Sequence, residues 1–276
     1  MKTFIKWQGN KSRHVNKIIK YIPEDINTYI EPFVGSGALL LALEPDKWII
    51  NDLNKDLVLI WKYIKEDPET IIKMFKTFGK TFKPLSKQDK IDKCTNIIKK
   101  FDHMKYDIKR ASLYMLMKYC SFMGNIMKNK KYFFNGLEMN IYVDSYPFLK
   151  EANYNNLLNV SDYLNDTNGK IYNKDYTVIL DKAKKGDFVF LDPPYLEQHN
   201  YNFNYNKDEI INEVFIKNLL KELKKLDKKG VKWMMTQANT TQIRKIFKDY
   251  TIKTFKAYRA SKKTHVNELI IMNYSI

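Results

Sequence analysis

The sequence predicts an α/β protein with a doubly wound sheet that is interrupted by a mainly helical insert. Residues 28–52 read as a strand, a glycine-bearing turn, a helix and a second strand, which is the βαβ unit that opens such a sheet. Between residues 56 and 148 the pattern changes to apolar residues at helical spacing with lysines between them. Strand patterns return after the insert and continue to the end of the chain.

The expected elements follow in order along the chain. Thr28–Ile30 is the first strand, EPFVGSGALLLAL is a turn and a helix through Leu43, and KWIINDLN is a strand that ends at Asp52. In the insert, LVLIWKYIKEDPETIIKMFKTF and KRASLYMLMKYCSFMGNI have helical spacing. After a helix over residues 212–230, the last strands are close in sequence, which predicts an antiparallel hairpin at the sheet edge. The strand patterns after the insert are GKIYNKDYTVIL, DFVFLDPPY, VKWMMTQAN, YTIKTFKAYRA and VNELIIMNYSI.

The charge of the chain points to a polyanionic partner. Its 276 residues carry a net charge of +17, and residues 55–150 hold 20 Lys and Arg against 10 Asp and Glu. Only four of the 48 basic residues are Arg, which indicates an AT-rich coding sequence and accounts for part of the lysine content. The excess of basic over acidic residues still favours nucleic acid as the partner.

The sequence argues against a membrane or secreted protein. No apolar run approaches the roughly 18 residues of a membrane span, and the N-terminal residues lack the apolar stretch of a secretory signal. Cys94 and Cys120 do not have the spacing of a zinc site and read as ordinary buried thiols in a reducing compartment. We therefore expect no membrane partner, no metal and a cytoplasmic location, in the nucleoid or, for a viral protein, in the host cytoplasm.

The stretch FVFLDPPY places a carboxylate where a buried strand ends. Phe188–Leu191 is apolar on both faces, and Asp192 follows at its C-terminal tip. Pro193 and the next proline remove two backbone donors, and Tyr195 adds an aromatic ring. These groups form a small acceptor site with a stacking wall, although an Asp-Pro turn alone also explains the pattern.

Three further stretches have the chemistry of a cofactor site. Gly35 and Gly37 lie where a strand turns into a helix, and Asp52 at the next strand tip is placed to accept from ribose hydroxyls. Trp7 is suited to cover an apolar part of a ligand, and Lys11 to meet a carboxylate. A plain turn, a helix cap and N-terminal strand packing are the alternatives, but together the first two stretches favour an adenosine-bearing cofactor.

The order KWxGxK, EPFVGSG, NDLN, long insert, DPPY resembles the DNA adenine N6-methyltransferases of the Dam group, class alpha. The resemblance covers nearly the whole chain, including RASKKTHVNELIIMNY near its end. It implies the Rossmann-like fold of methyltransferases that use S-adenosylmethionine (SAM), with S-adenosylhomocysteine as the product. It also implies a SAM-binding catalytic domain over residues 1–55 and 149–276 and an inserted helical DNA target-recognition domain over residues 56–148.

The resemblance also assigns roles to residues. It implies that Asp192, Pro193 and Tyr195 are catalytic and that Lys6 touches DNA. Asp175 and Tyr176 are expected to meet the adenine of SAM. The implied cofactor-binding residues are Trp7, Gly9, Lys11, Glu31, Phe33, Gly35, Gly37, Asp52, Asp175, Tyr176 and Asp192.

The chemistry of adenine explains why the implied catalytic residues suit this reaction. The exocyclic amine is a poor nucleophile because its lone pair is delocalised into the ring. Asp192 and the carbonyl of Pro193 can accept its two N–H bonds, which favours a tetrahedral nitrogen with its lone pair aimed at the methyl group. Tyr195 can stack on the flipped base. No metal and no covalent enzyme intermediate are needed.

The sequence departs from the family where the insert reads DNA. The family has a guanine-reading arginine after its RxxLxxxLN helix, and residues 119–135 contain no arginine. GATC is the first expectation for the target, and this departure leaves it open. The expected DNA contacts are Lys6, Phe122, Met123, Lys128, Asn129, Lys130 and Arg259, with Tyr201, Phe203 and Tyr205 on a substrate loop.

Two alternatives to a DNA adenine methyltransferase stay open. One is an RNA or N4-cytosine methyltransferase, against which DPPY and the large basic insert both argue. The other is a non-catalytic DNA-binding relative, against which the intact Asp192, Tyr195, Gly35 and Asp52 argue. The expected partner is double-stranded DNA, the expected state is a monomer, and a cognate restriction endonuclease in a restriction-modification pair is left open.

Overall fold

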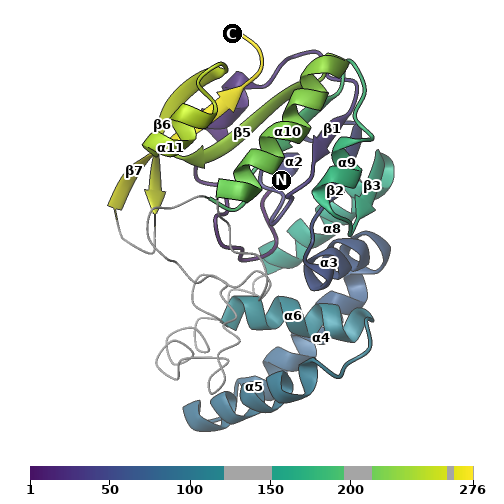
Figure 1. The fold of residues 1–276 in the computed structure, drawn as a ribbon. Helices are drawn as coiled ribbons and strands as arrows, with labels where there is room; N and C mark the ends of the chain where they lie inside the picture. The colour runs from purple at the N-terminus through teal and green to yellow at the C-terminus, as the bar shows by residue number, and fades with distance from the viewer. Residues whose placement is uncertain (121–150, 196–212, 260–263, 276) are drawn as a thin grey trace. The chain divides into compact units, whose positions relative to one another are not determined.

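The computed structural model describes residues 1–120, 151–195, 213–259 and 264–275 (Figure 1). They form two compact units, each built from several segments of the chain. The predicted division into a catalytic and a target-recognition domain is a division by role, and it stays a prediction. The first unit comprises Met1–Asn10, Gly35–Leu41 and Asn54–Thr167, and the second comprises Lys11–Val34, Ala42–Leu53 and Asn168–Ile276.

The second unit is built on a sheet of seven strands among the described residues, in the order β3-β2-β1-β4-β5-β7-β6. The first five strands in that order are parallel, and β7 runs antiparallel to both β5 and β6. The doubly wound α/β fold and the antiparallel hairpin at the sheet edge are therefore confirmed. The strands are β1 (Tyr29–Glu31), β2 (Lys47–Asn51), β3 (Asn168–Tyr172), β4 (Phe188–Leu191), β5 (Lys232–Ala238), β6 (Thr251–Arg259) and β7 (Thr264–Met272).

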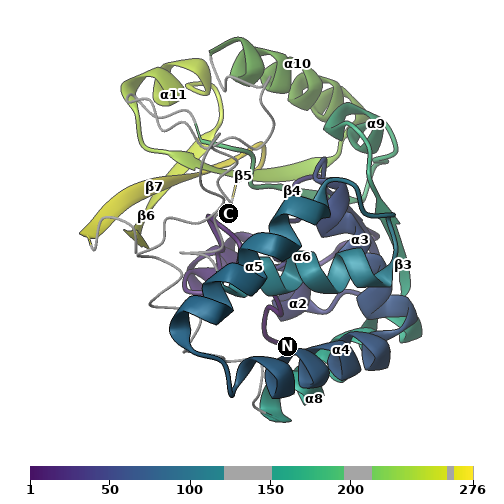
Figure 2. The same cartoon turned by 90° about the horizontal axis from the view of Figure 1, so that it is seen from below.

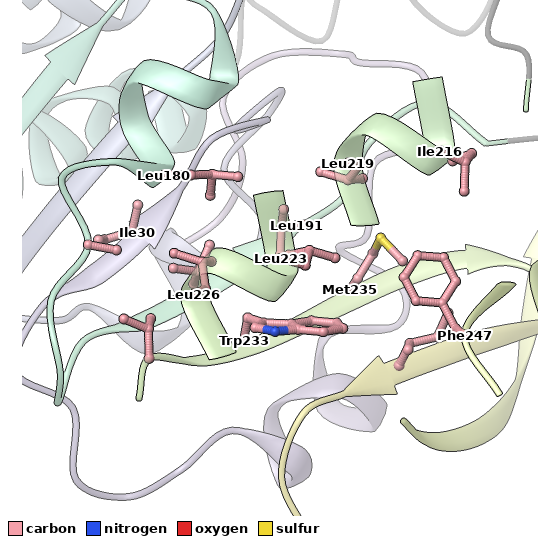
Figure 3. Close-up of a cluster of buried hydrophobic side chains, with 14 of the residues drawn as sticks. Ile30, Leu180, Leu191, Ile216, Leu219, Leu223, Leu226, Trp233, Met235 and Phe247 are labelled. Atoms are coloured by element: carbon pink, nitrogen blue, oxygen red, sulfur yellow. The ribbon is translucent and has the colours of Figure 1, made fainter. Parts of the chain in front are cut away.

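Helices α9 (Tyr176–Leu180), α10 (Glu213–Lys229) and α11 (Thr241–Ile246) cover one face of this sheet (Figure 2). Figure 3 shows how α10 places a row of leucines, spaced for one helical face, over the side chains of β4 and β5. All of these side chains are buried, so this layer forms the hydrophobic core of the unit. Its members include Leu191, Ile216, Leu219, Leu223, Leu226, Trp233, Met235 and Phe247.

The opposite face of the sheet is lined by the alternate residues of the same strands. Phe188 packs against Tyr29 of the neighbouring strand and against Tyr274, with ring centroids 6.2 and 6.4 Å apart. The Tyr274 hydroxyl donates to the carbonyl of Tyr21, at the end of the short helices α1 (Val15–Ile18) and η1 (Ile19–Tyr21). Both faces of β4 are therefore buried, as its four apolar residues predict.

The predicted strand over residues 169–180 is wrong in its second half. Strand β3 ends at Tyr172, and Asp175 then caps helix α9 by accepting from the backbone N–H of Thr177 at 2.9 Å. Side-chain capping gives the backbone a helical start that outweighs the β propensity of Thr177 and the residues after it. In β3 itself, Gly169 pairs with Trp48, and a β-carbon there would lie 1.8 Å from the indole.

The first unit is helical in its described part, as the insert pattern predicts. Asn54, Asp67 and Ser86 cap three of its helices through their side chains. Short helix α2 (Leu40–Leu43) lies where the chain passes from the first unit to the second. The longer helices are α3 (Lys55–Glu66), α4 (Pro68–Phe82), α5 (Lys87–Phe101), α6 (Ile108–Cys120) and α8 (Glu151–Asp166).

Buried Arg110 connects three helices of the first unit. Its guanidinium donates to both carboxylate oxygens of Asp56 on α3, at 2.6 and 3.1 Å, and to the carbonyl of Phe101 at the end of α5. Burial alone would lower the pKa of Arg110, but the hydrogen bonds and charge of Asp56 raise it, so the ion pair is maintained. No helix in the described ranges is long and apolar enough to cross a membrane.

Candidate active site

The carboxyl ends of four parallel strands bring most of the predicted site residues of the second unit to one edge of the sheet. Glu31 ends β1, Asp52 follows β2, Asp175 follows β3, and Asp192 follows β4. Strand β1 lies between β2 and β4: the chain continues from β1 to β2 and β3 on one side and then crosses to β4 on the other side. In doubly wound sheets ligands bind at such a switch point, outside the carboxyl ends of the strands.

Both carboxylate oxygens of Asp192 are held by side chains. Oδ1 accepts from the hydroxyl of Thr236 on β5 at 2.6 Å, and Oδ2 accepts from the Lys11 ammonium at 2.7 Å. Thr236 is fully buried and Lys11 nearly so, which makes these contacts strong and their geometry firm. Lys11 was expected to meet a carboxylate, and the carboxylate it contacts is that of Asp192.

Tyr195 is held by its hydroxyl. The hydroxyl donates to Oε2 of Glu268 on β7 at 3.0 Å, and the Lys11 ammonium lies 4.9 Å from the centroid of the ring. Burial, followed by the carboxylates of Asp192 and Glu268, raises the pKa of the Tyr195 phenol well above 10.0. The phenol therefore stays protonated and remains a hydrogen-bond donor across the physiological range.

An aromatic pair stands beside the strand ends. Phe33 and Tyr176 have ring centroids 5.4 Å apart, and Tyr176 also meets Phe215 edge-on at 5.8 Å. Asp175, the residue before Tyr176, is exposed. The carbonyl of Asp52 accepts a hydrogen bond from the side chain of Asn173, which fixes the backbone of Asp52. Apolar rings next to exposed or half-buried carboxylates suit an adenosine group, which needs stacking and acceptors for its N–H and O–H donors.

The glycine turn belongs to the first unit and is tightly enclosed there. Gly35 has φ +49°, and a β-carbon on it would lie 2.8 Å from the indole of Trp7. The carbonyl of Gly35 accepts from the indole N–H of Trp61 at 3.1 Å, and the Lys118 ammonium lies 4.0 Å from the Trp7 ring centroid. No sequence pattern indicates a role for Lys118, which is buried although charged.

Comparison with known proteins identifies the family. The profile of the D12 class N6 adenine-specific DNA methyltransferases matches residues 7–261. The chain belongs to this family. A Type II methyltransferase of Lactococcus lactis subsp. cremoris is 29% identical over 99% of this chain and 96% of its own, and one of Methanocaldococcus jannaschii is 30% identical over 99% of both.

The methyltransferase is also similar to proteins described as DNA adenine methylases. That of Haemophilus influenzae is 24% identical over 97% of this chain and 92% of its own. A solved structure of a methyltransferase with S-adenosylhomocysteine aligns over 49% of this chain and 40% of its own, at 12% identity and a TM-score of 0.28. That degree of structural similarity is too low to support an argument. The family assignment confirms the predicted resemblance and the prediction of an enzyme.

Several expected DNA contacts of the methyltransferase lie outside the described residues. Lys6 is described, and its ammonium donates to the carbonyl of Tyr119 near the end of α6 at 2.9 Å. Of the predicted cofactor-binding glycines, Gly9 is exposed with φ +75° and Gly37 is buried with φ +65°. Arg259 ends β6, but its side chain is outside the described part. Also outside the described residues are Phe122, Met123, Lys128, Asn129, Lys130, Tyr201, Phe203 and Tyr205.

Sequence reasoning missed two residues of the methyltransferase that contact the predicted catalytic ones. Thr236 and Glu268 lie 44 and 73 positions from their partners and reach them through the pairing of β5 with β7. The signal for Glu268 was a single acid before the apolar run LIIM, and for Thr236 a hydroxyl inside a buried strand. Within the described ranges, no three His, Cys, Asp or Glu side chains cluster as metal ligands.

Proposed function

We propose that this methyltransferase transfers a methyl group from SAM to the N6 amine of an adenine that is flipped out of duplex DNA. The observation that carries the proposal is Asp192, held on both oxygens at the tip of β4 beside the ring of Tyr195. Family membership supports adenine as the base and DNA as the substrate. The net charge of +17 supports a polyanion as the partner.

The residues at the strand ends fit the adenosine part of SAM. In this proposal Phe33 and Tyr176 contact the adenine face, Asp175 accepts from its amine, and Asp52 accepts from the ribose hydroxyls. When bound, SAM supplies a methyl group that its positively charged sulfur has already activated. Glu31 at the end of β1 is part of this proposed site. By family resemblance, Trp7, Gly9, Gly35 and Gly37 stay predicted cofactor-binding residues.

The chain's own task is to hold the amine. A carboxylate has about four lone-pair positions, and Lys11 and Thr236 occupy one on each oxygen of Asp192. The remaining positions, with the carbonyl of Pro193, accept the two N–H bonds of the amine. The nitrogen lone pair is thereby freed from the ring and would form the new N–C bond as the methyl–sulfur bond breaks and its electron pair stays on sulfur. One N–H proton must then leave, and Asp192, which already accepts that bond, is the base closest to it.

Tyr195 holds the base itself. Its ring is kept in place from two sides, by Glu268 at the hydroxyl and by the Lys11 ammonium near the ring. A flipped base that stacks on a fixed ring recovers part of the stacking it loses on leaving the duplex. The target sequence proposed first is GATC, and the Type II names of two relatives support a role in restriction-modification.

The test is methylation of unmethylated genomic DNA by the purified protein with SAM, followed by sequencing that detects N6-methyladenine. The expected result is N6-methyladenine at one short motif, and a motif other than GATC would correct the specificity alone. N4-methylcytosine, or methylation of RNA but not DNA, would replace the proposed reaction by one of the alternatives. Binding of DNA with no methylation of any nucleic acid would indicate the non-catalytic relative.

A further inference from the structure

Glu268 is a carboxylate in a place where carboxylates are rare. It lies in β7, in register with Ala238 of β5 on one side and Phe255 of β6 on the other, and only 6% of it is exposed. The four residues after it in the strand are fully buried and apolar. Burying a carboxylate costs on the order of several kcal/mol unless it is paired or hydrogen-bonded. A role for this side chain therefore has to be sought in what it contacts.

Glu268 shares a sheet face with Thr236. In the antiparallel pair, Thr236 lies opposite Ile270 and Ala238 lies opposite Glu268, so alternate residues put both polar side chains on the face away from α10. From that face Thr236 donates to Asp192, and Glu268 accepts from Tyr195. Two neighbouring strands thus supply one fixed partner to each of the two side chains proposed to act on the base.

We propose that Glu268 is a positioning residue of the methyltransferase, which fixes the ring of Tyr195 by accepting its hydroxyl so that the flipped adenine meets a preset stacking surface. The inference rests on the proposed function and adds to it a residue and a role. Glu268 does not itself touch the base or the methyl group in this account. It acts only through the hydroxyl of Tyr195.

The chemistry of the contact supports this role. A tyrosine ring swings about its first side-chain bond (χ1), and a hydrogen bond that anchors the hydroxyl at its far end restricts this motion. A charged acceptor makes that bond roughly twice as strong as a neutral one. The Lys11 ammonium, 4.9 Å from the ring centroid, helps to balance the negative charges of Asp192 and Glu268. Because the ring is already ordered before the base arrives, binding of the base does not include the entropy loss of ordering the ring.

The experiment is a double-mutant cycle between Glu268→Ala and Tyr195→Phe, with Glu268→Gln as the conservative variant. Tyr195→Phe keeps the stacking ring and removes only the donor. Glu222→Gln, which removes a carboxylate paired with Lys225 on α10, is the matched control. Two quantities are measured: the single-turnover methylation rate at saturating DNA, and the fluorescence of 2-aminopurine placed at the target adenine, which reports stacking of the flipped base.

The two single variants are expected to lower the rate by a similar factor, roughly tenfold, and to increase the 2-aminopurine signal as stacking loosens. Glu268→Gln keeps an acceptor and recovers part of the rate, and Glu222→Gln leaves it unchanged. In the Tyr195→Phe background, Glu268→Ala is expected to have no further effect, because the hydroxyl through which it acts is gone.

The inference is overturned if the two effects multiply, since Glu268 would then act on the fold or on another group. It is also overturned if Glu268→Ala leaves rate and fluorescence unchanged. In both cases the wild-type protein still methylates DNA, and the proposed function stands. If the wild-type protein methylates no DNA, the proposed function fails and the inference fails with it.

Discussion

At the scale of the residue, three side chains hold Asp192 and Tyr195 in place. Lys11 contacts both, through a 2.7 Å ion pair with the carboxylate and a 4.9 Å approach to the ring. Thr236 donates a hydrogen bond to Asp192, and Glu268 accepts one from Tyr195. Because each contact involves a buried partner, losing one leaves a polar group without compensation, and the effect on activity should be measurable.

Thr236→Val replaces a hydroxyl with a methyl group of similar size and removes the donor to Asp192. We expect the single-turnover rate to fall roughly tenfold, equivalent to ~1.4 kcal/mol, because the carboxylate loses one of its two fixed contacts. Thr236→Ser keeps the hydroxyl and should keep most of the rate. Equal rates for the valine and serine variants would show that the contact does not orient Asp192.

His14 gives a prediction about pH. Burial lowers its pKa below 6.5; Glu268 opposes this shift, whereas Lys17 and Lys11 add to it. Its Nε2 accepts from the backbone N–H of Tyr258, and its buried Nδ1 has no partner among the described residues. A histidine that is harder to protonate when folded contributes stability that is fully present above pH 6.5 and is lost as the pH falls through 6.5 toward the lowered value.

Urea unfolding between pH 5 and pH 8 measures this contribution. The free energy of unfolding should decrease below pH 6.5, and His14→Gln, which keeps an acceptor for Tyr258, should reduce that decrease. His265→Gln, at an exposed position, is the control and should leave the slope unchanged. A wild-type slope that His14→Gln does not alter would assign the pH dependence to other groups.

At the scale of the element, apolar spacing predicted helices in the insert because it is a local signal that acts within a few residues. Side-chain caps are equally local, and the structure shows that Asn54, Asp67 and Ser86 each begin a helix of the first unit. The wrong prediction over residues 169–180 also has a local cause, because Asp175 caps a helix at the start of an apolar stretch whose pattern also fits a strand. The pairing of strands carries no such local signal.

Arg110 is the element-scale contact whose loss should cost most stability in the first unit. Arg110→Lys keeps the charge but cannot donate to both oxygens of Asp56 and to the carbonyl of Phe101 at once. We expect a loss of about 3 kcal/mol in the free energy of unfolding, measured by urea denaturation. Arg244→Lys, where the guanidinium contacts Asn239 and Thr254 at the surface, should cost far less. Similar losses in both would contradict the account.

At the scale of the whole molecule, the fold class could be predicted and the full site could not. The order of motifs indicated a doubly wound sheet, and strand ends placed Asp52 and Asp192 at one edge. Thr236 and Glu268 depend on the register between β5 and β7, which the sequence alone does not reveal. The residues expected to read DNA in the insert fall outside the described part, so the specificity stays a prediction.

The charge of the chain gives a prediction for DNA binding. If the lysine excess contacts phosphates, the logarithm of the association constant should fall linearly with the logarithm of salt concentration, by about 0.9 per phosphate neutralised. Fluorescence anisotropy of a labelled duplex over a salt series measures this slope. A flat dependence would show that the net charge of +17 does not contact the DNA backbone.

The central claim is that Asp192 carries the reaction, and Asp192→Ala tests it most directly. We expect the single-turnover methylation rate on DNA to fall by about 100-fold or more, with the circular dichroism spectrum and DNA affinity retained. Asp249→Ala, which removes an exposed carboxylate after α11, should methylate at the wild-type rate. A folded Asp192→Ala protein with a rate near that of the wild type would contradict the account.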